Sequence, residues 1–428
     1  MSILINLAYF LGLILYSPVV LYRMIAHKRY RDGWAQRLGR VSRKEPGKRC
    51  VWIHAVSVGE VNAARTLIDA LKTALPDCEI VISSTTDTGL ARACALYDKQ
   101  HSVFYFPFDL SWIMKKAFDR LHPDILLLME LEVWPNLASI AQQRRIPVVV
   151  VNGRISERSF PKYLKFRKFV AAMFRKVALV LAQTQEYADR FVTLGCDPSN
   201  VVVTNSLKYD TAQTDGLVPG ADRIAEQIKL GTGRLWVLGG TGPGEERIGL
   251  EVFSRLKKEA EFDDLHLAII PRKPERFDEV AGLIDNSGFT FARFSKLKEN
   301  NSTADGRPVV ILGDTMGDLK KFYAIASLVF VGRTLTPMGG SDMMEPAALG
   351  KCTTFGPHTF NFKQTVDALL EGVGAIEVKD AEQLCDITRK CLTNRDFADA
   401  ISAAGQKIIR QNQGATKKSV DAIVKLLG

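Results

Sequence analysis

Short apolar segments of strand length alternate with helix-length amphipathic segments along this 428-residue chain, and the alternation starts twice. An unbroken apolar run such as 125–129 is typical of a strand buried on both faces, as in a parallel sheet. Such strands are predicted at 51–54, 79–83, 125–129, 147–151, 179–182 and 201–204, and again at 235–238, 265–270, 309–312 and 328–331. Two series of βαβ units therefore predict two Rossmann-like α/β domains.

The polar, glycine-bearing stretch 211–220 lies between the two series and reads as a linker. A chain of 428 residues is long enough for two domains of ordinary size. We place the first domain at 28–212 and the second at 213–428. Ligands bind beyond the carboxyl ends of the strands in open sheets of this kind. A cleft between the two facing domains is thus the expected site.

The N-terminus is unlike the rest of the chain, because residues 3–21 are almost wholly apolar. Basic residues follow: Arg23, His27, Lys28, Arg29 and Arg31. About 20 apolar residues suffice to cross a bilayer as a helix. The basic flank predicts an uncleaved anchor over 1–27 with the body in the cytoplasm. A buried core helix, or a segment lying in one leaflet and bent at Pro18, are the alternatives.

A second segment, 158–176, interleaves basic side chains with aromatic and aliphatic ones. This composition suits contact with anionic lipid headgroups. The alternative is a helix packed by its apolar stripe with a solvated basic face. The chain carries a net charge of +10, yet its basic residues cluster beside an apolar segment and no nucleic-acid motif accompanies them, so we expect no nucleic-acid partner.

Cysteine and histidine usage indicates neither a disulfide framework nor a metal centre. The seven cysteines are scattered without a CxxC pair, which favours a reducing compartment. The six histidines are dispersed. We therefore expect no metal and no cofactor.

Three residues at predicted strand ends in the first domain are candidates for chemistry. Glu60 opens a helix after the strand at 51–54, and a carboxylate there suits a general base. The alternative is an acidic residue that only complements the helix dipole. Glu130 stands at the end of the buried strand 125–129, where a carboxylate needs a partner. Lys208 follows the strand at 201–204 and can face a developing anion, or it is an ordinary surface lysine.

The second domain offers several loops suited to a nucleotide. The strand at 328–331 leads through a glycine-rich loop into a helix entered at Ser341 and Asp342, where backbone amides can hold a phosphate. Glu345 in that helix can accept hydrogen bonds from a ribose diol. An ordinary capped strand-to-helix turn is the alternative. Similar strand-end loops lie at 239–246, 271–276 and 313–318, although none has a complete phosphate-binding motif.

Ordered motifs across both domains closely resemble those of the 3-deoxy-D-manno-octulosonic acid (Kdo) transferases of lipopolysaccharide assembly. In the first domain they are His-Ala-Val-Ser-Val-Gly-Glu at 54–60, Glu-Leu-Glu-Val-Trp-Pro-Asn at 130–136, Asn-Gly-Arg-Ile-Ser-Glu-Arg-Ser at 152–159 and Ser-Leu-Lys-Tyr-Asp at 206–210. In the second they span 271–277, 314–319, 345–350 and 355–362.

The resemblance implies a GT-B fold with an N-terminal membrane-anchor helix, at the cytoplasmic side of the inner membrane. It implies transfer of Kdo from CMP-Kdo to a lipid A precursor of the lipid IVA type, with inversion and without a metal. Glu60 would be the base, and Glu130 and Lys208 would stabilise the transition state. The residues implied in CMP binding are Arg272, Lys273, Met316, Gly317, Asp318, Asp342, Met343, Met344 and Glu345.

The chain departs from the family pattern in three donor loops. Ser341 and Asp342 replace a usual His-Asn, Lys273 replaces a histidine, and 240–245 lacks the usual Ser-Thr-His-Glu-Gly-Glu. Two other functions therefore stay open. One is a GT-B transferase that uses another nucleotide-sugar, such as a UDP-sugar, on a membrane lipid. The other is a non-catalytic, membrane-tethered binding protein.

Overall fold

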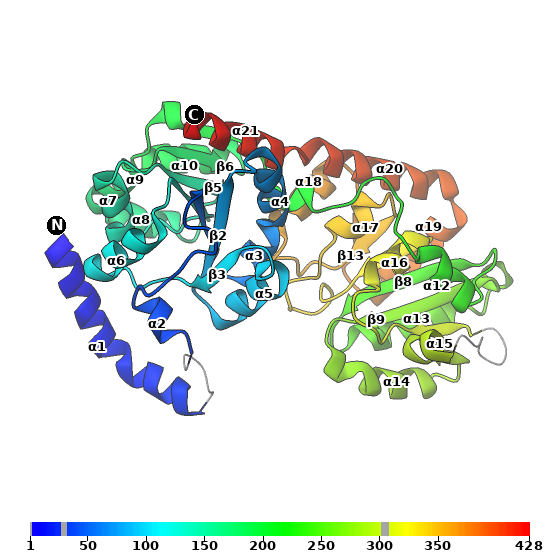
Figure 1. The fold of residues 1–428 in the computed structure, drawn as a ribbon. Coiled ribbons are helices and arrows are strands. Elements are labelled where there is room, and N and C mark those ends of the chain that lie inside the picture. The colour runs from blue at the N-terminus through cyan, green and yellow to red at the C-terminus, as the bar shows by residue number, and fades with distance from the viewer. Residues whose placement is uncertain (1, 27–31, 301–307) are drawn as a thin grey trace. The chain divides into compact units, whose positions relative to one another are not determined.

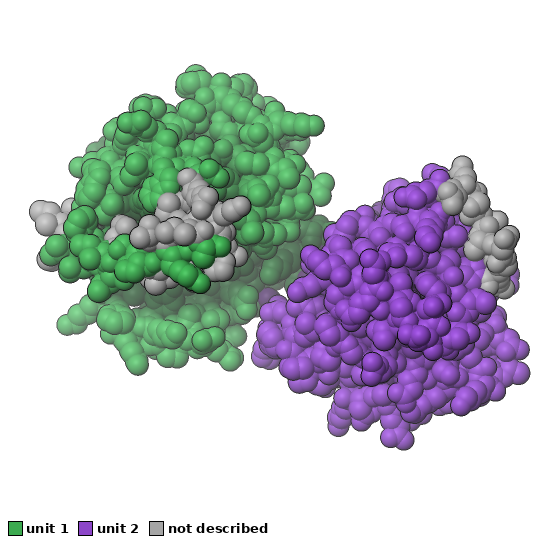
Figure 2. Space-filling view, turned by 90° about the horizontal axis from the view of Figure 1, so that it is seen from below, with its two compact units in different colours: residues 1–211, 413–428 green, residues 212–412 purple. Residues whose placement is uncertain are grey.

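The computed structural model describes residues 2–26, 32–300 and 308–428, which form two compact units. Unit 1 comprises Met1–Thr211 together with Gln413–Gly428, and unit 2 comprises Ala212–Asn412 (Figure 2). Each unit holds one seven-stranded sheet, and every strand pairing between neighbours is parallel. The two parallel α/β units predicted from the alternating pattern are therefore confirmed.

The sheet of unit 1 has the order β3-β2-β1-β4-β5-β6-β7. Its strands β2, β3, β5 and β6 are labelled in Figure 1. Its strands are β1 Arg49–His54, β2 Cys78–Ser84, β3 Ser102–Tyr105, β4 Ile125–Met129, β5 Val148–Gly153, β6 Leu179–Ala182 and β7 Val201–Val203. Its helices are α1 Ser2–Ala26, α2 Trp34–Arg37, α3 Val58–Ala63, α4 Arg65–Ala74, α5 Asp87–Tyr97, α6 Ser111–Leu121, α7 Pro135–Gln143, α8 Phe160–Lys165, α9 Arg167–Phe174, α10 Gln185–Thr193, α11 Leu207–Asp210 and α21 Ala415–Leu427.

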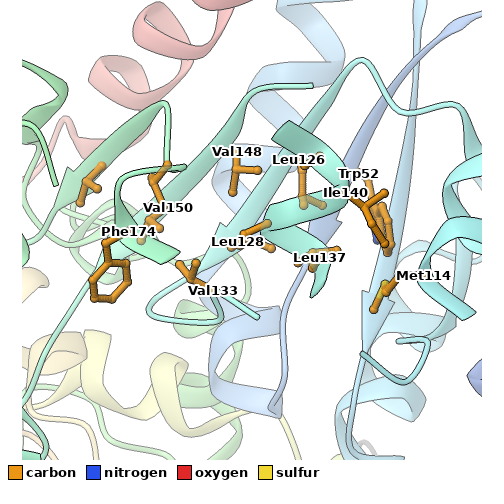
Figure 3. Packing of buried hydrophobic residues seen from close by; sticks show 14 of the residues in the cluster. Trp52, Met114, Leu126, Leu128, Val133, Leu137, Ile140, Val148, Val150 and Phe174 are labelled. Carbon is orange, nitrogen blue, oxygen red and sulfur yellow. The ribbon is translucent and has the colours of Figure 1, made fainter. Parts of the chain in front are cut away.

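Both faces of this sheet are buried, because successive side chains of a strand point to opposite faces. Trp52, Leu126 and Leu128 enter one apolar cluster, which α6, α7, α9 and α10 complete (Figure 3). Ile53 follows Trp52, and Leu127 lies between Leu126 and Leu128. These two side chains enter the other cluster, against α3, α4, α5 and α21. This double burial explains why strands such as β4 are apolar at every position.

Unit 2 repeats the plan with the strand order β10-β11-β9-β8-β12-β13-β14. Its strands are β8 Arg234–Thr241, β9 Leu265–Pro271, β10 Phe291–Arg293, β11 Val310–Leu312, β12 Leu328–Val331, β13 Thr353–Phe355 and β14 Ile376–Glu377. Its helices are α12 Ala221–Gln227, α13 Glu245–Leu256, α14 Phe277–Asp285, α15 Phe294–Asn300, α16 Leu319–Ile325, α17 Met344–Ala348, α18 Lys363–Glu371, α19 Ala381–Thr393 and α20 Arg395–Asn412.

The chain returns to unit 1 at its end, which differs from the single range 213–428 expected for the second domain. After α20, Gly414 adopts a left-handed φ of 100° and α21 begins. Val420 and Ile423 of α21 are buried in the apolar cluster of unit 1, and the helix contacts α4 and α11. Asp210 accepts hydrogen bonds from the backbone N–H groups at the start of α21.

The expected membrane-spanning anchor needs correction. Residues 2–26 form the helix α1, but within the described ranges no helix meets the length and apolarity needed to cross a bilayer. Part of α1 makes polar contacts with the rest of unit 1. Asn6 Nδ2 donates to Ser111 Oγ at 2.7 Å, and the Tyr9 hydroxyl donates to Asp109 Oδ2 at 3.0 Å.

Candidate active site

The strand order of unit 1 creates a switch point between β1 and β4. From β1 the chain proceeds outward to β2 and β3, whereas β4 lies on the other side of β1 and leads to β5. The loops that follow β1 and β4 therefore diverge from the carboxyl ends of these two strands, and open parallel sheets bind ligands at such a point. Glu60 lies in the loop-to-helix segment after β1, and Glu130 directly follows β4. Two predicted site residues thus meet at the switch point.

Glu60 occupies a helix-capping position. Ser57 is the N-cap of α3, the Glu60 Oε1 atom accepts from the Ser57 hydroxyl at 2.9 Å, and Oε2 accepts from the backbone N–H of Val56 at 2.9 Å. These bonds lower the pKa of Glu60, but burial outweighs them. With added repulsion from Glu130 and Glu132, burial raises its pKa to about 7. The carboxylate can therefore take up and release a proton near neutral pH.

Glu130 has a left-handed backbone with φ 57°, which is rare for a residue other than glycine. Its backbone N–H donates to the carbonyl of Val151 at 2.9 Å, which continues the pairing of β4 with β5. Strained backbones of this kind cluster at functional sites. Glu132 lies nearby: it accepts from Trp134 Nε1 at 3.0 Å, and burial raises its pKa. Three carboxyl groups therefore influence one another at this edge.

Lys208 lies in the first turn of α11, after β7. The hydroxyl of Ser206, the N-cap residue of this helix, accepts from the Lys208 backbone N–H. The side chain of Lys208 is exposed, whereas Leu207 and Tyr209 on either side are buried. The lysine is thus presented from a fixed backbone at the same carboxyl edge of the sheet. The sequence-based choice of Lys208 is compatible with this placement, and its role stays a prediction.

Unit 2 has its own switch point between β8 and β12. The loop after β8 and the glycine-rich loop after β12 meet there. Buried Glu245, the first residue of α13, ties them together. Its carboxylate accepts backbone N–H groups from Gly242, Arg333, Thr334 and Leu335. These four amides are satisfied by a protein carboxylate. The amides at the helix start near Ser341 and Asp342, which the sequence suggested for a phosphate, are a different set, and their role stays a prediction.

Glu345 lies in α17 just beyond this loop. Burial raises its pKa to about 7, repulsion from Asp342 adds to the shift, and Lys320 and Arg272 oppose it. Asp342, Lys320 and Arg272 are thus close enough to Glu345 to act on its charge. Arg272, Asp342 and Glu345 are predicted donor residues, whereas Lys320 was missed by sequence reasoning. Glu345 and the cations Arg272 and Lys320 suit the ribose and phosphate of a nucleotide, whereas Asp342 already accepts the backbone N–H of Met344 at 2.9 Å.

Tyr323 is a second residue that the sequence did not mark. It is fully buried, and its hydroxyl has no hydrogen-bond partner among the described residues. Burial, with Glu345 and Asp342, raises its pKa well above the usual value. A Cβ added at Gly239 would lie 2.2 Å from this hydroxyl, so the glycine is required by close packing. Sequence offered no signal, because an apolar helix position for a tyrosine looks like ordinary core.

The remaining predicted donor residues differ in what their side chains can do. Met343 and Met344 have buried side chains, so a ligand could contact only their main chain, and the Met344 N–H already donates to Asp342 Oδ1 at 2.9 Å. The Asp318 carboxylate accepts from Lys298, Lys321 and Thr315, and these hydrogen bonds lower its pKa to about 2 despite burial. The other members of the set are exposed at strand-end loops: Lys273, Met316 and Gly317.

Arg276, from the cationic loop after β9, is committed to structure. It is buried and binds the fully buried Glu246 through two nitrogens at 2.6 and 3.1 Å, and it also pairs with Glu279. It therefore holds α13 and α14 together. Within the described ranges, no group of three or more histidine, cysteine, aspartate or glutamate residues is arranged to hold a metal ion.

Comparison with known proteins resolves the family. A family model described as 3-deoxy-D-manno-octulosonic-acid transferase (kdotransferase) matches residues 32–211. A 3-deoxy-D-manno-octulosonic acid transferase of Haemophilus influenzae is 32% identical over 397 residues, which cover 92% of this chain and 91% of that protein. This chain belongs to the Kdo transferase family. The resemblance predicted from the motifs is thereby confirmed.

Other matches agree with this membership. A 3-deoxy-D-manno-octulosonic acid transferase of Bordetella pertussis is 31% identical over 406 residues, which cover 92% of this chain and 91% of that protein. The solved glycosyltransferase of Rickettsia africae shares 16% identity and a TM-score of 0.56, and covers 89% of this chain and 99% of that chain. The latter likeness concerns the fold alone. The Kdo transferase described here is therefore a glycosyltransferase with two parallel-sheet α/β units resembling those of GT-B enzymes.

Proposed function

We propose that this Kdo transferase moves Kdo from CMP-Kdo to a hydroxyl of a lipid A precursor of the lipid IVA type, at the cytoplasmic face of the inner membrane. The observation that carries the proposal is Glu60. Its carboxyl group lies at the switch point of unit 1 beside Glu130, and burial places its pKa at about 7. A general base works best with a pKa near the operating pH.

In the proposed reaction, Glu60 accepts the proton of the acceptor hydroxyl. The acceptor oxygen forms a bond to the anomeric carbon of Kdo, and the bond from that carbon to the CMP phosphate oxygen breaks on the opposite face. The configuration inverts and CMP leaves. Glu130 favours the positive charge that develops on the sugar, and Lys208 favours the negative charge on the departing phosphate.

CMP would bind at the switch point of unit 2. Arg272 and Lys273 are exposed cations after β9 and suit the phosphate. Glu345, with a pKa near 7, suits hydrogen bonding to the ribose diol. The exposed turn at Met316 and Gly317 and the backbone of 342–344 complete the donor site. Asp318 would act indirectly, because its carboxylate anchors Lys298 and Lys321.

An anionic, membrane-held acceptor agrees with the surface of unit 1. Phe166 and Phe169 of the segment 158–176 are exposed by 69% and 44%, and exposed Lys165, Arg167 and Lys168 surround them. Helix α1 exposes further apolar side chains: Leu7, Phe10, Leu11, Ile14 and Leu15. Apolar side chains among cations favour an interfacial position on anionic lipid. This supports the alternative in which the N-terminal segment lies in one leaflet.

The test is transfer to a tetraacylated lipid A precursor, with CMP-Kdo generated in the reaction and the lipid followed by mass spectrometry. We expect a mass increase of one or more Kdo units that is lost in Glu60→Gln. Glu186→Gln is the matched control, since Glu186 is an exposed first-turn glutamate of α10. No mass increase, from folded protein that binds CMP, would favour a transferase for another nucleotide-sugar. Undiminished transfer by Glu60→Gln would exclude Glu60 as the base.

A further inference from the structure

Asn152, near the end of β5, has an unusual backbone for its place in a buried strand. It is only 1% exposed and adopts a left-handed φ of 56°. Asparagine tolerates this conformation better than most residues, but the conformation still costs free energy and persists only where the surroundings require it. The next residue, Gly153, completes the strand and pairs with Ala182 of β6 across a register shift. The sheet is therefore locally reshaped at Asn152.

Only the oxygen of the Asn152 side-chain amide is hydrogen-bonded among the described residues. Its Oδ1 atom accepts from the backbone N–H of Leu207 at 3.0 Å, and its main-chain carbonyl accepts from Gln183 Nε2 at 2.9 Å. Its Nδ2 atom is buried without a hydrogen-bond partner among the described residues. Buried polar groups are nearly always paired, so an unpaired amide donor needs an explanation.

Asn152 lies between the residues proposed for transition-state stabilisation. On one side, Glu130 donates its backbone N–H to the carbonyl of Val151, the residue before Asn152. On the other side, Leu207 is the first residue of α11, and Lys208 follows it. The hydrogen bond from Leu207 to Asn152 thus joins the start of α11, which carries Lys208, to the strand next to Glu130.

We propose that Asn152 has a positioning role and a substrate-binding role in transfer: its amide oxygen holds the turn that presents Lys208, and its Nδ2 donor binds an oxygen of the bound substrates. This inference rests on the proposed function. A ligand oxygen would satisfy the donor only in the complex, so the cost of leaving it unpaired in the free enzyme is recovered when substrate binds.

Two variants of the full chain separate the oxygen from the donor. Asn152→Gly accepts the left-handed backbone and removes both groups. Asn152→Asp retains an oxygen for Leu207 and removes the donor. Arg145→Gly is the control, because Arg145 also has a left-handed φ, of 59°, outside the site residues. The readouts are hydrogen exchange of residues 207–210, melting temperature, and kcat and KM for the donor sugar.

In Asn152→Gly we expect exchange of 207–210 to rise at least about tenfold and kcat to fall about 10- to 100-fold, since small misplacements of catalytic groups have effects of this size. In Asn152→Asp we expect hydrogen exchange of 207–210 at the wild-type rate, but a kcat at least about tenfold below that of the wild type. Arg145→Gly should leave both unchanged. Wild-type exchange in Asn152→Gly would overturn the role of the oxygen, and full kcat in Asn152→Asp would overturn the role of the donor.

These readouts distinguish this inference from the proposed function. If the wild-type protein transferred no Kdo, the proposed function would fail in the wild-type control itself. The exchange measurement does not depend on transfer, so it still decides whether Asn152 holds α11. The combination of normal transfer in the wild type and unchanged exchange and kcat in Asn152→Gly would overturn the positioning role alone.

Discussion

Two opposing effects act on the Glu60 carboxylate. Its hydrogen bonds from the Ser57 hydroxyl and the Val56 backbone N–H favour the charged form. Burial and the neighbouring Glu130 favour the neutral form, and they prevail, since the pKa rises to about 7. The capping and catalytic interpretations left open by the sequence are therefore compatible: the capping bonds aim the carboxylate, and burial sets its basicity.

The first prediction concerns the pH dependence of transfer. A base must be ionised, so kcat/KM should rise about tenfold per pH unit below pH 7 and level off above it, following the pKa of about 7 for Glu60. Rates between pH 5.5 and 8.5 with subsaturating acceptor would show this limb. A profile that is flat down to pH 5.5 would contradict a base with this pKa.

The second prediction concerns stability. The folded pKa of Glu60 is raised from 4.5 to about 7, so between these values the folded state binds more protons than the unfolded state. The free energy of unfolding therefore falls as pH rises through this window. Glu60→Gln should remove that penalty. The gain in free energy of unfolding of the variant over the wild type should therefore be larger at pH 8 than at pH 5 by roughly 1–3 kcal/mol, allowing for partial exposure. Denaturant unfolding at the two pH values is the measurement; an equal effect at both would refute it.

At the scale of elements, Glu245 joins the start of α13 to the loop after β12 through backbone N–H groups of Arg333, Thr334 and Leu335. A single buried side chain thus shapes the loop that leads to Asp342 and Glu345. The sequence pattern of 239–246 resembled a phosphate loop. Its residue Glu245, however, accepts the backbone N–H groups of the neighbouring loop, the one after β12.

The third prediction follows from this arrangement. Glu245→Gln replaces one acceptor oxygen with an amide group that faces backbone donors, so unit 2 should lose about 2–4 kcal/mol of stability and CMP should bind more weakly. Glu251→Gln is the control, since Glu251 lies on the same helix and is 53% exposed. Chemical unfolding and calorimetric titration with CMP would measure the two effects. Equal behaviour of the two variants would show that the loop does not depend on Glu245.

At the scale of the whole molecule, the last helix belongs to the unit that the chain left at Thr211. Helix α21 buries Ala415, Val420 and Ile423 in the core of unit 1, beside residues of α4. The two units are therefore linked by two crossings of the chain. This arrangement makes unit 1 dependent on residues at both ends of the sequence.

The fourth prediction tests that dependence. Ile423 is fully buried, so Ile423→Ala should destabilise unit 1 by about 2–5 kcal/mol and leave unit 2 unaffected. Lys425→Ala, at an exposed position of the same helix, should change little. Hydrogen exchange resolved by segment would assign the loss to one unit. Increased exchange in β8 and β9 rather than in β1 and β4 would contradict the placement of α21.

Local patterns predicted much of the fold. The run 125–129 coincides with β4, and 179–182 and 328–331 coincide with β6 and β12, because strands buried on both faces must be apolar throughout. The return of α21 was not predictable, because its amphipathic pattern suits any apolar partner. The anchor over 1–27 was inferred from the apolar run and its basic flank, which could not report the polar contacts of Asn6 with Ser111 and of Tyr9 with Asp109.

The sequence by itself determined the alternation of strands and helices, the family of the chain, and the strand ends that carry Glu60, Glu130, Lys208 and Glu345. These depend on local patterns and ordered motifs. Only the tertiary structure decided that burial raises the pKa of Glu60 and Glu345 to about 7, that Glu245 holds a distant loop, and that Asn152 lies between Glu130 and Lys208. Burial and hydrogen bonding join residues far apart in the chain, and local patterns do not encode which residues will meet.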